Sequence, residues 1–157
     1  YSMMARDGRY VSRKLKIGAQ GIDHVYIKRN PVTTEIDEIL IIESKTDNAG
    51  LIPGNIEKGI PRQMSDEWIK KNLDIIIAKG DNQSKQLSKI IKDKLEKEPQ
   101  KVKRMVYRHD LENGKTTKIP LDKYGFEINE SAVESIEYYP MKNKLTAFAK
   151  SKGILVQ

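Results

Sequence analysis

The sequence predicts a single mixed α/β domain with an early antiparallel strand pair, two central helices and a later hairpin. Aliphatic stretches that alternate with polar residues are bounded by turn signals such as Asn30-Pro31 and Asn113-Gly114, which is typical of strands. Between these stretches, apolar residues recur at helical spacing in two windows. A length of 157 residues suits one domain, so residues 1–157 are treated as one unit.

The first third of the chain is expected to form two paired strands. Residues 1–17 show no clear pattern, and we expect a helix or a loose arm there, interrupted by Gly8. The stretch from Ile22 to Lys28 predicts the first strand, and EILIIESK at residues 38–45 predicts the second. Residues 46–64 are rich in glycine and proline and predict a long loop.

The middle of the chain predicts two helices. Ser65 is a suitable N-cap, Asp66 and Glu67 follow in the first turn, and Gly80 ends the periodic pattern. A second helix is expected from about Ser84 because leucines and isoleucines lie on one face: Leu87, Ile90, Ile91 and Leu95.

The remainder of the chain predicts a hairpin and one more helix. Residues 102–119 alternate about Asn113-Gly114, a strong two-residue turn signal. A late helix is expected around Lys142–Lys152, ended by Gly153.

The charge of the chain is unevenly distributed. The formal net charge is +7, with +5 in residues 1–31, −4 in residues 32–66 and +6 in residues 67–119. Cations attract phosphates and a local acidic patch can hold a metal ion, so this distribution suits a nuclease that uses a metal. A solvated basic surface without a partner explains the charge equally well.

Several classes of site and protein are excluded by composition. The chain has no cysteine, which rules out disulfides and thiolate metal sites. No apolar run approaches the ~20 residues of a membrane span, and no signal-peptide pattern is present.

The early strand pair is expected to bring charged side chains together. Alternation places Glu43 and Lys45 on one face of their strand. A turn centred on Thr33 sets Asp23 opposite Glu43, whereas a turn centred on Thr34 sets Asp23 opposite Lys45. Either register predicts two carboxylates and a lysine at one end of the hairpin.

Two carboxylates at this separation suit one divalent cation. Their oxygens are hard ligands that favour Mg²⁺ or Mn²⁺, with Zn²⁺ possible. The chemistry that follows is hydrolysis of a phosphodiester, with Lys45 orienting water or stabilising charge on phosphorus. An ordinary surface ion pair is the alternative interpretation.

These residues resemble a known nuclease motif. Asp23 followed by Glu43-Ser44-Lys45 resembles the D…(D/E)-x-K core of restriction-endonuclease-like nucleases. The segments GIDHVYIKR, EILIIESKT and RQMSDEWI resemble nuclease toxin domains at the C-termini of large secreted bacterial toxins, such as contact-dependent growth-inhibition effectors. The similarity covers residues 18–70, the expected catalytic core.

The resemblance implies a fold, an activity and a set of site residues. It implies a restriction-endonuclease-like mixed sheet flanked by helices, in which Asp23 and Glu43 bind the metal and Lys45 is catalytic. Gln63 lies where several such nucleases place a glutamine that positions water or phosphate, although a loop residue bonded to backbone is an equal alternative. Many members add a glutamate from the first helix, and here no glutamate precedes Glu35.

The resemblance also implies a biological setting. It implies secretion as part of a larger effector, action in the cytoplasm of a competitor cell, and a cognate immunity protein. The first residue, Tyr1, fits a domain from a longer chain.

Three alternatives of function remain open. DNA is the favoured substrate, and a structured RNA such as tRNA suits the same site. A metal-independent ribonuclease could use His24 and His109, and a non-catalytic module could bind nucleic acid through basic residues alone. The basic candidates for nucleic-acid contact, which could equally be solvated surface, are Lys85, Lys89, Lys101, Lys103 and Arg104.

Overall fold

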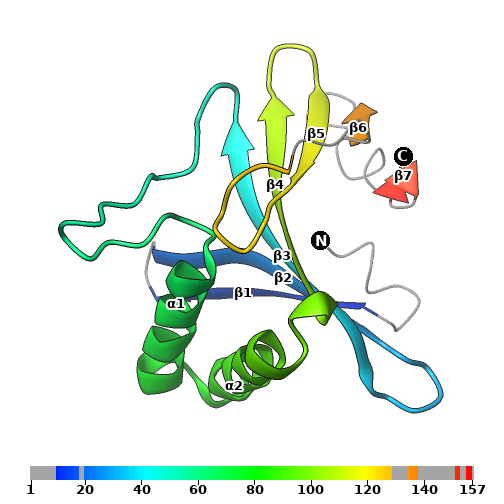
Figure 1. Cartoon of the computed structure of the whole chain (residues 1–157). Helices are drawn as coiled ribbons and strands as arrows, with labels where there is room; N and C mark the ends of the chain where they lie inside the picture. Colours follow the sequence, from blue (N-terminus) through cyan, green and yellow to red (C-terminus); the bar gives the residue numbers. More distant parts are fainter. Residues whose placement is uncertain (1–9, 18–19, 129–133, 138–150, 153–154, 157) are drawn as a thin grey trace.

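The structure is a computed structural model that describes residues 10–17, 20–128, 134–137, 151–152 and 155–156. The described part is a mixed α+β fold with one large sheet and two helices (Figure 1). Its elements are β1 (Tyr10–Ile17), β2 (Gln20–Arg29), β3 (Ile36–Thr46), α1 (Asp66–Lys79), α2 (Asn82–Lys97), a 3-10 turn (Pro99–Lys101), β4 (Val102–Asp110), β5 (Lys115–Pro120), β6 (Glu134–Glu137), β7 (Ser151–Lys152) and β8 (Leu155–Val156).

The large sheet has six strands in the order β1-β2-β3-β4-β5-β6. All neighbouring strands are antiparallel except β3 and β4, which are parallel. A parallel pair needs a crossover connection, and α1 and α2 provide it between β3 and β4. The prediction of a mixed sheet that begins with an antiparallel hairpin is therefore confirmed.

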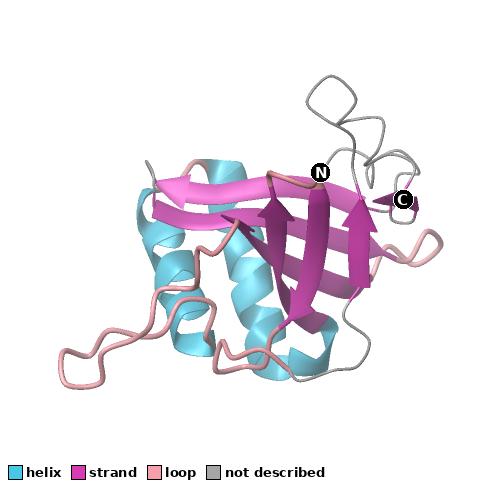
Figure 2. Cartoon of the chain, turned by 90° about the horizontal axis from the view of Figure 1, so that it is seen from above, coloured by secondary structure: helices cyan, strands magenta, loops and turns pink. Residues whose placement is uncertain are grey.

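Both described helices pack on the same face of the sheet (Figures 1 and 2). This arrangement buries one continuous apolar core between the two layers, which is the main source of stability expected for such a fold. The core residues of the sheet include Leu15, Val25, Ile39, Ile41 and Val106, and those of the helices include Ile69, Leu73, Ile76, Ile91 and Leu95. A smaller buried cluster of Tyr26, Ile42 and Tyr107 lies on the opposite face.

The helices follow their local sequence signals. The Ser65 hydroxyl accepts a hydrogen bond from the Trp68 amide, and α1 ends at Gly80, as predicted. The second helix starts slightly earlier than predicted, because Asp81 accepts a hydrogen bond from the Ser84 amide and acts as its N-cap.

The C-terminal predictions have mixed outcomes. The hairpin is present as β4 and β5, but a four-residue loop joins the strands instead of a two-residue turn. Asp110 stabilises this loop because its carboxylate accepts hydrogen bonds from the amides of Glu112 and Asn113. Residues 142–150 of the predicted late helix lie outside the described residues, and Ser151–Lys152 form a strand, so the prediction was wrong at these two positions.

The prediction for residues 1–17 was wrong where the structure describes them. Residues 10–17 form β1, which pairs antiparallel with β2, so β3 is the third strand of a meander. The alternating apolar positions Val11, Leu15 and Ile17 explain this, and Leu15 is fully buried in the core.

The register of β2 and β3 is that of a turn centred on Thr33. His24 pairs with Ile42, and Tyr26 pairs with Leu40. Continued one residue beyond this last pair, the register sets Asp23 opposite Glu43, which is one of the two predicted arrangements.

A bulge in β2 separates Asp23 from the regular pairing with β1. Val25 pairs with Arg13 and Ile22 pairs with Leu15, so two residues of β2 lie opposite one residue of β1. Gly21 next to this bulge has φ +132°, and a Cβ there would lie 2.3 Å from the carbonyl oxygen of Leu15.

Replacing Gly21 by alanine is therefore expected to destabilise the protein by about 2 kcal/mol or more, through backbone strain and displacement of β1. Gly50→Ala is the control, because a Cβ at Gly50 would have no neighbour within 4 Å. Chemical denaturation measures both variants, and equal effects would contradict the expectation.

Candidate active site

Asp23 is held at the bulge by neighbours from two strands. One oxygen of its carboxylate, Oδ2, accepts a hydrogen bond of 3.1 Å from the Ser44 amide of β3. The other, Oδ1, lies 2.5 Å from the ammonium nitrogen of Lys16 on β1. The carboxylate continues the hydrogen bonding between β2 and β3 just beyond the last paired residues, and its orientation is therefore fixed.

Glu43 is a buried acid with an unused oxygen. It lies on the helix-covered face of β3, because Ile39 and Ile41 of the same face belong to the main core. Glu43 as a whole is 6% exposed to solvent. The Oε2 atom lies 3.5 Å from Nζ of Lys45, whereas Oε1 is buried and has no hydrogen-bond partner. An unpartnered buried carboxylate oxygen is costly, and such a group is expected to have a ligand or a functional role.

The two carboxyl groups have opposite pKa shifts. Burial, and then the negative charge of Asp23, raise the pKa of Glu43 from 4.5 to about 7, against the opposing charge of Lys45. Burial also opposes ionisation of Asp23. The hydrogen bonds from Lys16 and from the Ser44 amide nevertheless outweigh burial and hold the pKa of Asp23 below its usual value. The pair therefore carries one fixed negative charge, and near neutral pH the second acid is readily protonated or ionised.

The raised pKa of Glu43 predicts a specific pH dependence of stability. Because the folded-state pKa lies above the unfolded value, the stabilisation is complete below about pH 4.5 and is lost as pH rises through about 7. Across this range the ionisation of Glu43 alone is expected to lower the free energy of unfolding by about 3 kcal/mol.

Burial lowers the pKa of His24 below 6.5, so His24 makes the protein more stable as pH rises towards 6.5. This opposes the effect of Glu43 over part of the same pH range. The quantity to measure is therefore the difference in free energy of unfolding between the metal-free protein and its Glu43→Gln variant. We expect this difference to move in favour of the variant as pH rises. A difference that stays constant would contradict the raised pKa.

The residues present fit a divalent cation in part. Asp23 and Glu43 offer carboxylate oxygens from adjacent strands, and the unpartnered Oε1 of Glu43 is an available ligand atom. Within the described residues, no group of three or more His, Cys, Asp or Glu residues gathers to hold a metal. Mg²⁺ commonly binds through one or two carboxylates, with waters and substrate phosphates completing its shell, so two carboxylates suit it.

Gln63 is buried and bonded to the loop before it. Its side-chain carbonyl accepts a hydrogen bond of 2.9 Å from the backbone amide of Ile52, and its backbone amide donates to the Ile52 carbonyl. These contacts match the structural alternative, in which Gln63 fixes the loop of residues 47–64 to the start of α1. The predicted role in positioning water or phosphate stays a prediction.

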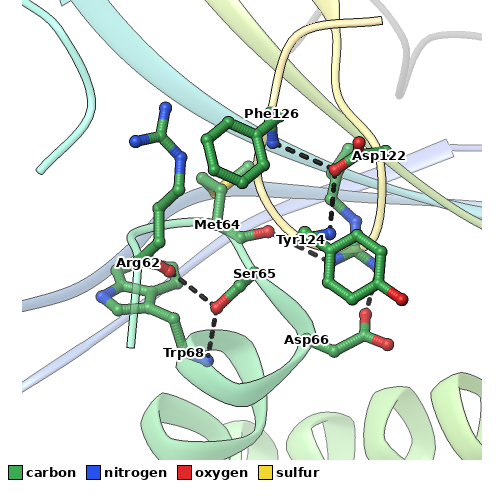
Figure 3. A network of polar contacts seen from close by, with 9 residues as sticks. Arg62, Met64, Ser65, Asp66, Trp68, Asp122, Tyr124 and Phe126 are labelled. Atoms are coloured by element: carbon green, nitrogen blue, oxygen red, sulfur yellow. Dashed lines mark hydrogen bonds and ion pairs between the residues drawn. The ribbon is translucent and has the colours of Figure 1, made fainter. Parts of the chain in front are cut away.

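A network of contacts fixes the start of α1 (Figure 3). The guanidinium of Arg62 stacks on the ring of Phe126, 4.3 Å from its centroid, and its Nε donates to the Gly125 carbonyl. Arg104 on β4 donates to the Met64 carbonyl and to the Asp66 carboxylate, 2.6 Å away. The loop that follows β5 is thereby joined to the start of α1.

This network corrects the prediction for Arg104. The residue is 6% exposed and both ends of its guanidinium are bonded, so it is not available to a nucleic-acid backbone. The cause is alternation along β4, which turns Arg104 towards the helices and Lys103 towards solvent.

The other predicted basic residues are spread over two elements. Lys89 is exposed and Lys85 half-buried on α2, and Lys101 is paired with Glu98 at 2.9 Å. Lys103 is aligned with Leu40, which lies near the middle of β3 and five residues before Lys45. Strand pairing places none of these four residues at the end of the sheet that holds Asp23 and Glu43. Their contact with nucleic acid stays a prediction.

The two histidines lie apart on the sheet. Strand pairing aligns His24 with Ile42 and Ile42 with Met105, whereas His109 lies four residues farther along β4. That offset corresponds to roughly 13 Å along the strand. His24 stacks on Tyr26, and His109 Nδ1 lies 2.8 Å from the Thr116 hydroxyl. The pair is too widely separated to act as one acid and base on the same phosphate.

Two charged residues at the candidate site were missed from sequence. Lys16 contacts Asp23, but the residues around it were expected to form a helix or an arm; the alternation of Leu15 and Ile17 is the signal for a strand. Arg108 is aligned with Lys45 across the parallel pair β3–β4. This alignment cannot be predicted from sequence unless the path of the crossover between the two strands is known. Asp47 lies in the turn that follows β3, and its carboxylate accepts a hydrogen bond from the Leu111 amide.

Comparisons with known proteins do not place the chain in a family. No family model, curated protein or solved structure matches it. In the described part of the chain, neither helix has the length and apolar character needed to cross a lipid bilayer.

Proposed function

We propose that the protein is a metal-dependent nuclease that hydrolyses phosphodiester bonds. One observation carries the proposal: Asp23 and Glu43 converge from adjacent strands beside Lys45, and a buried oxygen of Glu43 lacks any partner. Most buried carboxylate oxygens in proteins have a hydrogen-bond partner, so an unpartnered one beside a second acid and a lysine supports a ligand or a functional role.

The proposed roles follow from the contacts of each residue. Asp23 and Glu43 would hold the divalent cation, Mg²⁺ or Mn²⁺, which when bound polarises a phosphoryl oxygen and acidifies water. Lys45 lies beside Glu43 and is 16% exposed in its side chain, so its ammonium can reach a phosphate while remaining in place. It would stabilise negative charge that develops on the phosphate oxygens.

The proposal includes a substrate and a setting. DNA is the favoured substrate, and tRNA or another structured RNA is the alternative that the same site suits. The resemblance of residues 18–70 to toxin nucleases extends the proposal to release from a larger secreted effector, action in the cytoplasm of a competitor and neutralisation by an immunity protein.

A side-by-side cleavage assay tests the proposal. The protein and its Glu43→Ala variant are incubated with plasmid DNA and with total tRNA, in Mg²⁺, Mn²⁺, Zn²⁺ or EDTA. We expect loss of at least one substrate by the parent protein with a divalent cation, and no loss with the variant or with EDTA.

The other outcomes are equally informative. Cleavage that persists in EDTA would reject the metal site. Absence of cleavage under every condition would favour a non-catalytic module that binds nucleic acid through its basic surface.

A further inference from the structure

Arg108 shares its end of the sheet with the candidate active site. In the parallel pairing of β3 and β4, Lys45 is aligned with Arg108 and Glu43 with Val106. Neighbouring strands lie about 4.8 Å apart, and residues aligned across them project from the same face. Val102 and Val106 belong to the main core, so alternation along β4 places Arg108 on the helix-covered face, as Glu43 and Lys45 are on β3.

The hydrogen-bonding capacity of Arg108 is almost unused. Its Nε atom is buried and has no hydrogen-bond partner. One terminal nitrogen approaches the Ala49 carbonyl at 3.4 Å, which is long for a hydrogen bond. Among the ion pairs between described residues, none includes Arg108, although carboxylates lie nearby in the fold. Asp47 uses its carboxylate for the Leu111 amide, and Glu43 faces Lys45.

A second arginine on the same face shows what a structural role looks like here. Arg104 lies four residues nearer the start of β4 and is bonded to the Met64 carbonyl and the Asp66 carboxylate. Both arginines are thus partly or fully withdrawn from solvent, but only Arg104 has protein partners that satisfy it. A buried guanidinium nitrogen without a protein partner, as Nε of Arg108 is, suggests that a ligand supplies the acceptor.

We propose that Arg108 and Lys45 together form a phosphate-binding site at the carboxyl ends of β3 and β4. A planar guanidinium donates two parallel hydrogen bonds to phosphate oxygens, whereas an ammonium acts as a point charge, so the two groups are complementary. The ligand is a phosphate of the nucleic-acid backbone, and its identity as nucleic acid rests on the proposed nuclease function.

Binding of a short fluorescent single-stranded DNA, and of the RNA of the same sequence, tests the site in EDTA, where no metal-dependent cleavage occurs. The variants are Arg108→Met, Arg108→Lys and the control Arg29→Met. Arg29 also ends a strand and donates to one backbone carbonyl, that of Thr34, but lies at the opposite end of the sheet.

Arg108→Met is expected to bind about tenfold more weakly or worse. The slope of log K against log salt concentration is expected to fall by about 0.7, the contribution of one phosphate contact on a single strand. Arg108→Lys keeps the salt slope and loses part of the affinity. The thermal unfolding temperature of Arg108→Met stays equal or rises, since a buried unpartnered donor is removed; a merely structural arginine would lower it.

The proposal is overturned if Arg108→Met binds as tightly as the parent, if Arg29→Met loses as much affinity, or if the parent binds neither oligonucleotide.

These binding outcomes can be distinguished from those of the cleavage assay. A protein that cuts nucleic acid but is insensitive to Arg108→Met keeps the proposed function and loses this site. A protein that binds through Arg108 without cutting keeps the site and loses the nuclease.

Discussion

The Glu43→Gln variant is expected to lose metal-dependent cleavage while gaining stability above neutral pH. Glutamine has nearly the shape of glutamate but binds divalent cations poorly, so the cation would lose one of its two protein ligands. The charge of ionised Glu43 is unfavourable in the fold, since burial and Asp23 raise its pKa to about 7. Removing that charge is expected to add about 1–3 kcal/mol to the free energy of unfolding of the metal-free protein.

The two effects together separate function from folding. Cleavage is measured on the substrate that the parent protein cuts, and unfolding is measured with denaturant above pH 7. Glu38→Gln is the control, because Glu38 lies on the same strand, aligned with Lys28 at its other end. A Glu43→Gln protein that is less stable than the parent would show that the carboxylate has a structural role.

The Lys45→Met variant is expected to lose rate and keep its metal. The Lys45 ammonium lies 3.5 Å from Glu43 and would act on charge that develops in the transition state, so its loss should reduce cleavage about 100-fold or more. Methionine retains much of the apolar stem, which limits the effect on folding. Single-turnover cleavage measures the rate, and calorimetric titration of Mn²⁺ measures binding.

The control for Lys45 is Lys79→Met, at the exposed last residue of α1. A Lys45→Met protein that cuts at the parental rate would refute the catalytic role. One that loses Mn²⁺ binding as completely as Glu43→Gln would show that Lys45 acts through the carboxylates.

Local signals made part of the fold predictable. Helix α1 runs from Asp66 to Lys79 as expected, because its N-cap Ser65 and its stop Gly80 act within the helix itself. Strand β1 was missed because its alternating apolar residues are interspersed with basic ones, and only pairing with β2 decides their conformation.

The candidate site was predictable only where it depends on a single hairpin. Alternation and turn geometry were sufficient to place Asp23 opposite Glu43. The nearby cations depend on contacts that the sequence does not reveal. Lys16 reaches Asp23 from β1, and Arg108 comes beside Lys45 only after two helices return the chain to the sheet. For the same reason Arg104 could not be recognised as buried before the helix layer was known.

The most direct test of the account is a calorimetric titration of Mn²⁺ into the metal-free protein at pH 7, repeated in buffers of different ionisation enthalpy. With the pKa of Glu43 at about 7, one bound ion should displace about half a proton from the site. The Glu43→Gln variant should bind much more weakly and release none. If the parent binds no ion, or if the variant binds with equal affinity and proton release, Asp23 and Glu43 do not form a metal site.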